Sequence, residues 1–410
     1  MWSVREQNRM QDEILKERLY GLMPELMKEC GVNMWAVISR EYNEDPLFKS
    51  LVPAAVHSAG RTVCLVFCLD GAGRFEALNV SRPDDRLKGY YTQAMQRGDE
   101  VFCALNRLIR EKNPGRVHVN VSADCAIADG LSRHLYERLR LATSDSVPLV
   151  SAEQIAVRWI ETRTPGELAL YPEIYRLMTD IVDEVFSPAC ITPGVTTTTD
   201  LEWEVTERVN RLGLSCWFSP DIDLQRFGEP DFRMTGETIR EGDIVHCDVG
   251  LACMGLHTDT QRNIYIGRKG EKDIPAGIRA AFRTGCRFQD IVRGEYRVGR
   301  TGNEILAAAL EQAGREGIEA MCYCHPIGAF GHGAGPLIGL YDNQRFVPGQ
   351  GEFIMHDDTC YALELNISQA VPEWDGQKVC MMLEETIAFT GGETRFMDDR
   401  REIIRFLKTE

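Results

Sequence analysis

The sequence predicts an α+β fold in two parts: a smaller N-terminal α/β domain over residues 1–155 and a larger C-terminal domain over residues 156–410. A chain of 410 residues has the length of about two or three domains. Helical and strand-like patterns alternate in the first part, which is typical of a small α/β domain. In the second part long helical patterns come first and glycine-rich strands follow, which favours a separate domain.

The N-terminal elements follow from periodicity and turn residues. Residues 12–31 predict an amphipathic helix, because apolar side chains recur at helical spacing and Gly31 follows as a stop signal. Residues 34–43 predict a short strand and a loop. Two strands joined at Gly71–Gly73, a helix that stops at Pro114–Gly115 and the strand RVHVNV complete the domain.

The larger domain is predicted to begin with two helices. TPGELALYPEIYRLMTDIVDEVF has a helical pattern, and Pro172 inside it predicts a later start or a kink. ITPGVTTTTDLEWEVTERVNRLGL predicts a turn and a second helix, which a Thr199–Glu202 capping box begins and Gly213 ends. Further helices are expected at about 275–292 and 302–316, among the strands.

Charge and hydropathy exclude several classes of partner. The net charge of −16 argues against nucleic acid, which needs a basic face, and against anionic membranes. No apolar run approaches the roughly 18 residues of a membrane span, and the charged N-terminal segment lacks the apolar region of a signal peptide. We therefore expect a cytoplasmic protein without nucleic-acid or membrane partners.

The fourteen cysteines are too dilute for a disulfide scaffold, and most lie in apolar runs. Buried free thiols in a reducing cytoplasm are the expected state. Cys322 and Cys324 come just before His325, but a zinc knuckle needs a second Cys or His pair at a fixed spacing. A structural zinc site is therefore not expected.

Five residues of the larger domain carry the chemistry: Asp248, Asp259, His325, Glu364 and Glu384. Four carboxylates and one imidazole suit a pair of divalent cations, and a metal-bridged hydroxide is a strong nucleophile near neutral pH. EGDIVHCDVGLACMGLHTDTQRNIYIG predicts two antiparallel strands joined near Gly255, which fold the two aspartates towards each other. Both aspartates could instead be turn or edge residues, but a buried carboxylate in a strand is costly unless it is paired or bound to metal.

The same segments resemble the pita-bread metallopeptidases, which include methionine aminopeptidase, aminopeptidase P and prolidase. The motifs GDIVHCDVG, HTDTQR and NIYIG stand in the family's order, and HPIGAFGHGAGP, YALELN and MLEETIAFT follow. The resemblance implies metal ligands at Asp248, Asp259, His325, Glu364 and Glu384. It implies that His332, seven residues after His325, faces the substrate. The alternative is that His332 is the ligand, because it lies in a GHG triplet. Glu385 is expected on the opposite face of its strand.

The N-terminal part also carries a resemblance. CGVNMWAVISREYNEDP is similar to the smaller domain of prolidase, aminopeptidase P and creatinase. The resemblance implies a creatinase-type domain that forms a homodimer and reaches towards the partner's site. Arg40, Asp45 and Pro46 are candidates for such contacts. The alternative is a solvated loop, since Asn, Asp and Pro are ordinary turn residues.

One part of the pattern departs from the family. Its peptidases carry a further substrate-binding histidine upstream of the first metal aspartate, whereas no histidine occurs between Cys216 and Val245 here. That region reads EPDFRM, so Asp231 and Arg233 become candidate substrate-binding residues. A charged group in place of a neutral ring changes what a pocket can hold. The alternative is that both are plain loop residues.

The predicted function is a dinuclear-metal hydrolase, an Xaa-Pro aminopeptidase or dipeptidase that cleaves the N-terminal peptide bond. By the resemblance, Asp259 and Glu384 bridge the metals, Glu364 exchanges the proton and His332 holds the oxyanion. Two Mn²⁺ ions suit the oxygen-rich set best, with Co²⁺, Zn²⁺ or Fe²⁺ as alternatives. A second hypothesis is a metal-dependent hydrolase or lyase of a small non-peptide amide or amine. A third is a metal-free binding module, which leaves the four carboxylates unexplained.

Overall fold

The computed structural model describes residues 2–399, 402 and 404–409. The chain divides into two compact units, Met1–Gly166 and Glu167–Glu410, which are described separately. The division lies later than the expected boundary at 155/156, because α6 (Glu153–Glu161) packs within the first unit. Trp159 of that helix is buried, and its Nε1 donates to Ser50 Oγ at 2.8 Å.

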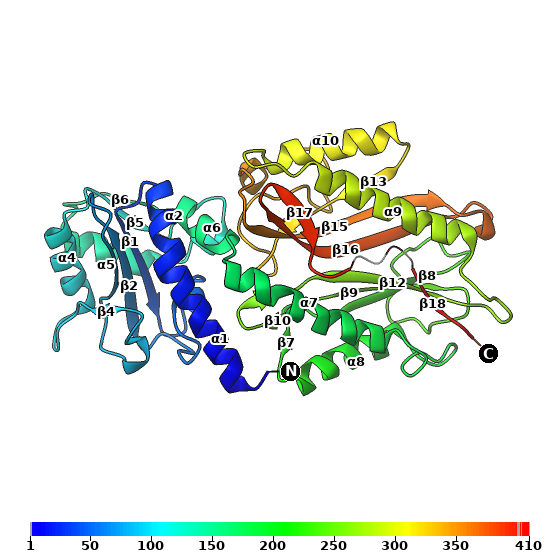
Figure 1. The fold of residues 1–410 in the computed structure, drawn as a ribbon, viewed down its shortest axis with the longest axis horizontal. Coiled ribbons are helices and arrows are strands. Elements are labelled where there is room, and N and C mark those ends of the chain that lie inside the picture. Colours follow the sequence, from blue (N-terminus) through cyan, green and yellow to red (C-terminus); the bar gives the residue numbers. More distant parts are fainter. Residues whose placement is uncertain (1, 400–401, 403, 410) are drawn as a thin grey trace. The chain divides into compact units, whose positions relative to one another are not determined.

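The first unit is built on a six-stranded sheet in the order β4-β3-β2-β1-β5-β6. The pairs β1–β2 and β2–β3 are antiparallel, and the pairs β1–β5, β5–β6 and β3–β4 are parallel. The strands are β1 (Met34–Arg40), β2 (Thr62–Leu69), β3 (Phe75–Asn79), β4 (Thr92–Gln93), β5 (Val117–Val119) and β6 (Leu149–Ser151). The helices are α1 (Val4–Glu17), a π-helical segment (Arg18–Leu22), α2 (Met23–Glu29), α3 (Phe48–Leu51), α4 (Val101–Lys112) and α5 (Arg133–Thr143). Helix and strand therefore alternate as expected (Figure 1).

The first helix begins earlier than the sequence pattern indicated, because Ser3 and Glu6 form a capping box at its N-terminus. The polar residue Asp45 is buried rather than solvated. Its Oδ1 accepts from Leu47 N at 2.9 Å, and its Oδ2 accepts from Asn120 Nδ2 at 2.8 Å. These bonds pin the turn after β1, and they leave the Asp45 carboxylate with a structural role within its own unit.

The second unit begins with the two expected helices. α7 (Pro165–Val185) contains Pro172 within its span. α8 (Thr198–Arg211) starts at a capping box formed by Thr197 and Asp200, not by Thr199 and Glu202. The expected box is therefore wrong by two residues. α9 (Ala276–Gly294) and α10 (Gly302–Arg315) follow close to the expected positions.

A nine-stranded sheet forms the centre of the second unit, with a main order of β13-β15-β16-β12-β9-β8. Its strands are β8 (Asp221–Gln225), β9 (Ile244–Val249), β12 (Thr260–Ile266), β13 (Glu319–Cys322), β14 (His325–Pro326), β15 (Thr359–Ala370), β16 (Lys378–Thr390), β17 (Glu393–Phe396) and β18 (Arg405–Leu407). β7 (Ser215–Cys216), β10 (Leu251–Cys253) and β11 (Leu256–His257) form a small separate sheet. β9 and β12 pair antiparallel, with a tip at Met254 and Gly255, so the hairpin expected near Gly255 is present.

The two faces of this sheet differ in character. α9 and α10 cover one face, where Phe282, Phe288 and Leu306 pack in a core with Leu363 and Leu365 of β15 (Figure 1). Side chains alternate along a strand, so the residues next to these leucines point to the other face. That other face carries the polar residues of the candidate site.

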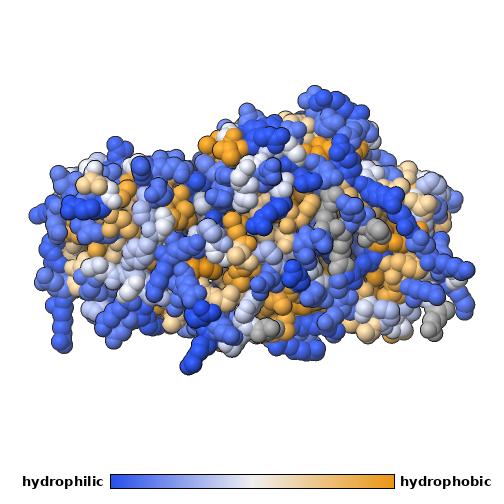
Figure 2. Space-filling view, viewed as in Figure 1, coloured by the Kyte–Doolittle hydropathy of each residue, from blue (hydrophilic) through white to orange (hydrophobic). Residues whose placement is uncertain are grey.

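The face of the molecule shown in Figure 2 is mainly polar. In the view of Figure 2 hydrophilic side chains predominate, with smaller apolar areas between them. Among the residues that the structure describes, no helix combines the length and the apolar character needed to cross a bilayer.

Candidate metal centre

A row of polar residues crosses the sheet of the second unit. In the strand register Asp221 (β8) pairs with Asp248 (β9), Asp248 with Gln261 (β12), Gln261 with Glu384 (β16), and Glu384 with Glu364 (β15). Residues directly opposite each other in a sheet point to the same face. Five neighbouring strands therefore present these side chains side by side, on the face away from α9 and α10.

Asp259 and His325 complete the cluster. Asp259 lies two residues before Gln261, and β14 brings His325 beside β15. His325 Nε2 lies 3.6 Å from Asp259 Oδ2, 3.9 Å from Glu364 Oε2 and 3.9 Å from Glu384 Oε1. The sequence-predicted ligands thus converge in space.

The ligand atoms fall into two groups. Asp259, His325 and Glu384 form one, and Asp248, Glu364 and Glu384 form the other. Within each group, one ligand atom per residue lies within 4.8 Å of the others. Glu384 belongs to both, which is the position of a residue that could bridge two cations.

The donor set fits divalent cations. Asp248 Oδ1, Asp259 Oδ1, His325 Nε2 and both carboxylate oxygens of Glu384 are buried and find no hydrogen-bond partner among the described residues. Unsatisfied buried polar atoms are rare in native proteins, and a bound ion is one explanation for them. Carboxylate and imidazole groups are the ligands that Mn²⁺, Zn²⁺ and related ions accept.

The pKa shifts at the site also indicate that it could bind divalent cations. Burial raises the pKa of Glu384 well above its usual value, and Asp259 raises it further. Burial, and then Asp248, likewise raise the pKa of Glu364. Burial lowers the pKa of His325 to about 4, so its imidazole is neutral at pH 7 and able to act as a ligand. Divalent cations would offset the mutual repulsion of the carboxylates.

Of the two histidines in HPIGAFGH, the structure places His325 in the cluster. Its Nδ1 lies 3.1 Å from Pro326 O, which leaves Nε2 towards the carboxylates. The centroid of the His332 ring lies 4.6 Å from that of the His325 ring and 5.1 Å from that of the Trp217 ring, and both contacts are edge-to-face. Burial, and then His325, lower the pKa of His332 to about 4, so it too is neutral.

Trp217 supports the His332 loop. Its Nε1 donates to Thr258 O at 2.8 Å. A Cβ atom at Gly331 would lie 2.4 Å from the Trp217 ring, so the glycine allows the loop to approach the indole. Sequence reasoning missed Trp217, and its only signal is an aromatic pair, Trp217–Phe218, just before β8.

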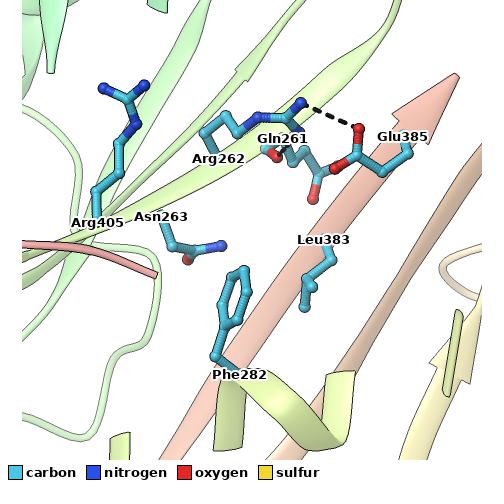
Figure 3. A pocket seen from close by; sticks show the side chains of 7 residues that line it. All are labelled: Gln261, Arg262, Asn263, Phe282, Leu383, Glu385 and Arg405. Atoms are coloured by element: carbon cyan, nitrogen blue, oxygen red, sulfur yellow. Dashed lines mark hydrogen bonds and ion pairs between the residues drawn. The ribbon is translucent and has the colours of Figure 1, made fainter. Parts of the chain in front are cut away.

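A buried clamp lies behind the metal ligands, on the opposite face of the sheet. Arg262 Nη1 donates to Glu384 O at 3.1 Å, and Arg262 Nη2 donates to Glu385 Oε2 at 3.0 Å. Tyr175 OH donates to the same Glu385 oxygen at 2.5 Å. Figure 3 shows Arg262 facing Glu385 in a small cavity that Phe282 and Leu383 also line. Glu385 points away from the cluster, as expected, and the clamp fixes the backbone that carries Glu384.

The two candidate substrate residues lie at different places. Asp231 is exposed, and its Oδ1 accepts from Arg233 N at 2.9 Å. Arg233 Nε donates to Asp223 Oδ2 at 2.9 Å, and its guanidinium also pairs with Asp221. The structure therefore brings Arg233 to the edge of the carboxylate row and leaves Asp231 on the surface. Sequence reasoning missed Asp221 and Asp223, although aspartates two residues apart in the strand DIDLQ share one face.

Solved structures with the same fold cover nearly the whole chain. An X-Pro aminopeptidase from Thermotoga maritima is 13% identical with a TM-score of 0.67, and the match covers 93% of this chain and 100% of that one. An Xaa-Pro dipeptidase from Bacillus anthracis is 15% identical with a TM-score of 0.63, covering 98% and 100%. The N-terminal domain of the FACT complex subunit SPT16 from chickpea is 11% identical with a TM-score of 0.60, covering 97% and 99%. At these identities the likeness shows the two-domain pita-bread fold.

The family is shown by sequence. A comparison with curated proteins gives no match. The model of metallopeptidase family M24 matches residues 173–391, which is more than half of the chain and includes every residue of the two ligand groups. The chain therefore belongs to metallopeptidase family M24 and is a peptidase with a carboxylate and histidine cluster that could hold metal.

Proposed function

We propose that the chain is a two-metal Xaa-Pro peptidase, an aminopeptidase or a dipeptidase. The observation that carries the proposal is the pair of ligand groups that share Glu384. When bound, two divalent cations supply Lewis acidity and lower the pKa of water at the site. Mn²⁺ suits the oxygen-rich donor set, with Co²⁺, Zn²⁺ or Fe²⁺ as alternatives.

Each residue has a separate task in this proposal. By the resemblance, Asp259 and Glu384 would serve both cations, Asp248 would complete one ligand shell, and His325 and Glu364 would complete the other. In the structure the ligand atom of Glu364 groups with those of Asp248 and Glu384. Five protein ligands from separate positions along the chain hold the ions in one geometry, which a flexible loop could not do.

Two side chains act on the substrate. Glu364 accepts a proton from the attacking water and returns it to the leaving nitrogen. His332 is neutral at pH 7, so one ring nitrogen carries a hydrogen that is donated to the carbonyl oxygen as negative charge develops there. Trp217 holds the His332 ring by a direct aromatic contact, which keeps the donor in place.

The N-terminal unit supplies the remaining part of the proposal. We infer that it mediates a homodimer, as the resemblance of CGVNMWAVISREYNEDP to two-domain relatives implies. All fourteen cysteines are free thiols in the structure, which supports a reducing compartment such as the cytoplasm.

The test is hydrolysis of Xaa-Pro dipeptides and longer Xaa-Pro peptides by metal-stripped protein, with and without added Mn²⁺. Turnover that depends on Mn²⁺ supports the proposal, and the length preference separates a dipeptidase from an aminopeptidase. His332→Ala should lower kcat by about 10²–10³-fold with little change in KM, since it removes a donor to the developing oxyanion. An increase in KM with kcat unchanged would contradict the role of His332.

A second candidate is a metal-dependent hydrolase or lyase of a small non-peptide amide or amine. The observation that favours it is the charged group Asp221, Asp223 and Arg233 beside the carboxylate row. A charged edge selects a polar or charged substrate group over an apolar one. No turnover of any Xaa-Pro peptide by protein that binds Mn²⁺ would favour this candidate.

A further inference from the structure

A continuous line of buried polar contacts leads from Arg233 to the metal cluster. Arg233 Nε donates to Asp223 Oδ2 at 2.9 Å, and the same oxygen lies 3.3 Å from His246 Nδ1. His246 Nε2 lies 3.2 Å from Gln261 Oε1. Gln261 Nε2 donates to Glu364 Oε1 at 2.6 Å. The first links join neighbouring strands or a loop, and the last reaches from β12 past β16 to β15, so the line crosses the sheet beside the ligands.

The residues in the middle of this line are shielded from solvent. Asp223 is 0% exposed, His246 1% and Gln261 5%. A buried polar group destabilises the folded protein unless its hydrogen bonds are made. His246 and Gln261 therefore have partners that solvent cannot replace.

The direction of the hydrogen bonds is fixed by the carboxylates. Gln261 Nε2 lies 2.6 Å from a Glu364 oxygen and 3.4 Å from Asp248 Oδ2. A flipped amide would set the Gln261 oxygen against two carboxylate oxygens, which repel it. The amide oxygen must then face His246, whose Nε2 carries the hydrogen. A hydrogen bond from His246 Nε2 to the amide oxygen then stabilises this orientation of Gln261.

The contact with Gln261 also gives the two oxygens of the Glu364 carboxylate different roles. Gln261 occupies Oε1, which leaves Oε2, the oxygen 3.9 Å from His325 Nε2, for a cation. Residues that hydrogen-bond to ligating carboxylates orient them for the ion. A Glu364 side chain without this bond could rotate and lose its alignment with the other ligands.

We propose that Gln261, oriented by His246, is a positioning residue that aligns Glu364 for metal binding. The inference rests on the proposed metal function of the cluster, and it assigns a role to the buried line from Asp223 to Gln261. Gln261 touches a ligand and not the reacting atoms, so its effect is exerted through Glu364.

Metal titration without substrate tests the proposal. The affinity of the metal-stripped protein for Mn²⁺ is measured by calorimetry for wild type and Gln261→Met, which keeps the length of the side chain and removes its three hydrogen bonds. The matched control is Gln225→Met. Gln225 is equally buried, with bonds to the Cys380 backbone at 2.6 and 2.7 Å. Circular dichroism and thermal melting establish that each variant is folded.

We expect Gln261→Met to weaken Mn²⁺ binding by about 10–100-fold, the usual effect of removing a partner of a ligand, and Gln225→Met to change it by less than about 3-fold. An affinity of Gln261→Met within about 3-fold of wild type would overturn the proposal, as would an equal loss in the control.

His246 variants test the same line without changing Gln261. His246→Leu removes the donor and should weaken Mn²⁺ binding as Gln261→Met does, whereas His246→Gln keeps a donor and should restore it to within about 3-fold. Equal affinities of the two His246 variants would refute the orienting role. The Mn²⁺ titrations need no substrate. If the variants bind Mn²⁺ as expected but wild type does not hydrolyse Xaa-Pro peptides, the result counts against the proposed function and not against the positioning role of Gln261.

Discussion

Neighbouring glutamates on β16 should respond in opposite ways to the same substitution. Glu384 points into the ligand cluster, where neither of its oxygens has a hydrogen-bond partner among the described residues. Glu385 points to the other face and pairs with Arg262 at 3.0 Å. Glu384→Gln and Glu385→Gln change one atom at adjacent positions in the same strand, so each is the control for the other.

The magnitudes follow from the geometry. Two unit charges 4.8 Å apart, the limit within a ligand group, repel by about 3.5 kcal/mol at an effective dielectric constant of 20. The raised pKa of Glu384, caused by burial and by Asp259, means that bound protons already relieve part of this repulsion without metal. Glu384→Gln should therefore stabilise the metal-stripped protein by about 1–3 kcal/mol. Glu385→Gln leaves the buried Arg262 without its charged partner and should destabilise the protein by about 3–5 kcal/mol.

The assay is thermal melting of the full chain after metal removal, repeated with excess Mn²⁺. For a domain of this size, about 1 kcal/mol corresponds to about 2–4 °C. Without metal, Glu384→Gln should melt several degrees above wild type and Glu385→Gln well below it. At 100 times its dissociation constant, Mn²⁺ should stabilise wild type by about 2.7 kcal/mol per ion, so wild type then overtakes Glu384→Gln.

Two results would refute the reasoning. Destabilisation of the metal-stripped protein by Glu384→Gln, to the same extent as by Glu385→Gln, would show that Glu384 makes a stabilising contact. A full gain in melting temperature on adding Mn²⁺ to Glu384→Gln would show that the ion binds without this carboxylate.

Two further changes test other parts of the molecule. Gly331→Ala places a Cβ 2.4 Å from the Trp217 ring and should displace the His332 loop, which should lower kcat/KM by about 10²-fold. The control Gly314→Ala has open space around its Cβ and should leave kcat/KM unchanged. Equal kcat/KM values for the two variants would contradict the role of the Gly331–Trp217 contact. Burial raises the pKa of Asp45 to about 6, so between about pH 4 and 6 the folded state keeps a proton that the unfolded state has lost, and stability falls as pH rises through that window. Urea unfolding should show that Asp45→Asn lacks this decline of up to about 3 kcal/mol, and parallel pH profiles of the two proteins would contradict it.

The resemblance to the pita-bread metallopeptidases implied the convergence of the carboxylates, and strand alternation is a local rule that added the direction of single side chains. Glu384 and Glu385 could be assigned to opposite faces from their positions alone. The expected His325 position also matches the geometry, since β14 brings its Nε2 to the carboxylates. These features depend on residues close in sequence and on the order of the strands.

Other features depend on three-dimensional contacts that no local pattern encodes. The line from Arg233 through Asp223 and His246 exists because a loop folds back over the edge of the sheet. The cap of α8 has a similar cause. Four consecutive threonines offer several caps, and the pairing of Thr197 with Thr238 selects the second of them. Tertiary pairing, not propensity, decides between such alternatives.

The distribution of the ligands over separate strands has a consequence for folding. Asp248, His325, Glu364 and Glu384 come from four strands, and a long stretch of chain separates the first from the last. No single strand carries this ligand set, so the site is complete only after most of the sheet has formed. Interactions that are absent from the folding transition state leave the folding rate unchanged and slow unfolding. A metal bound in this way would act late, and its main effect would be to lengthen the lifetime of the native state.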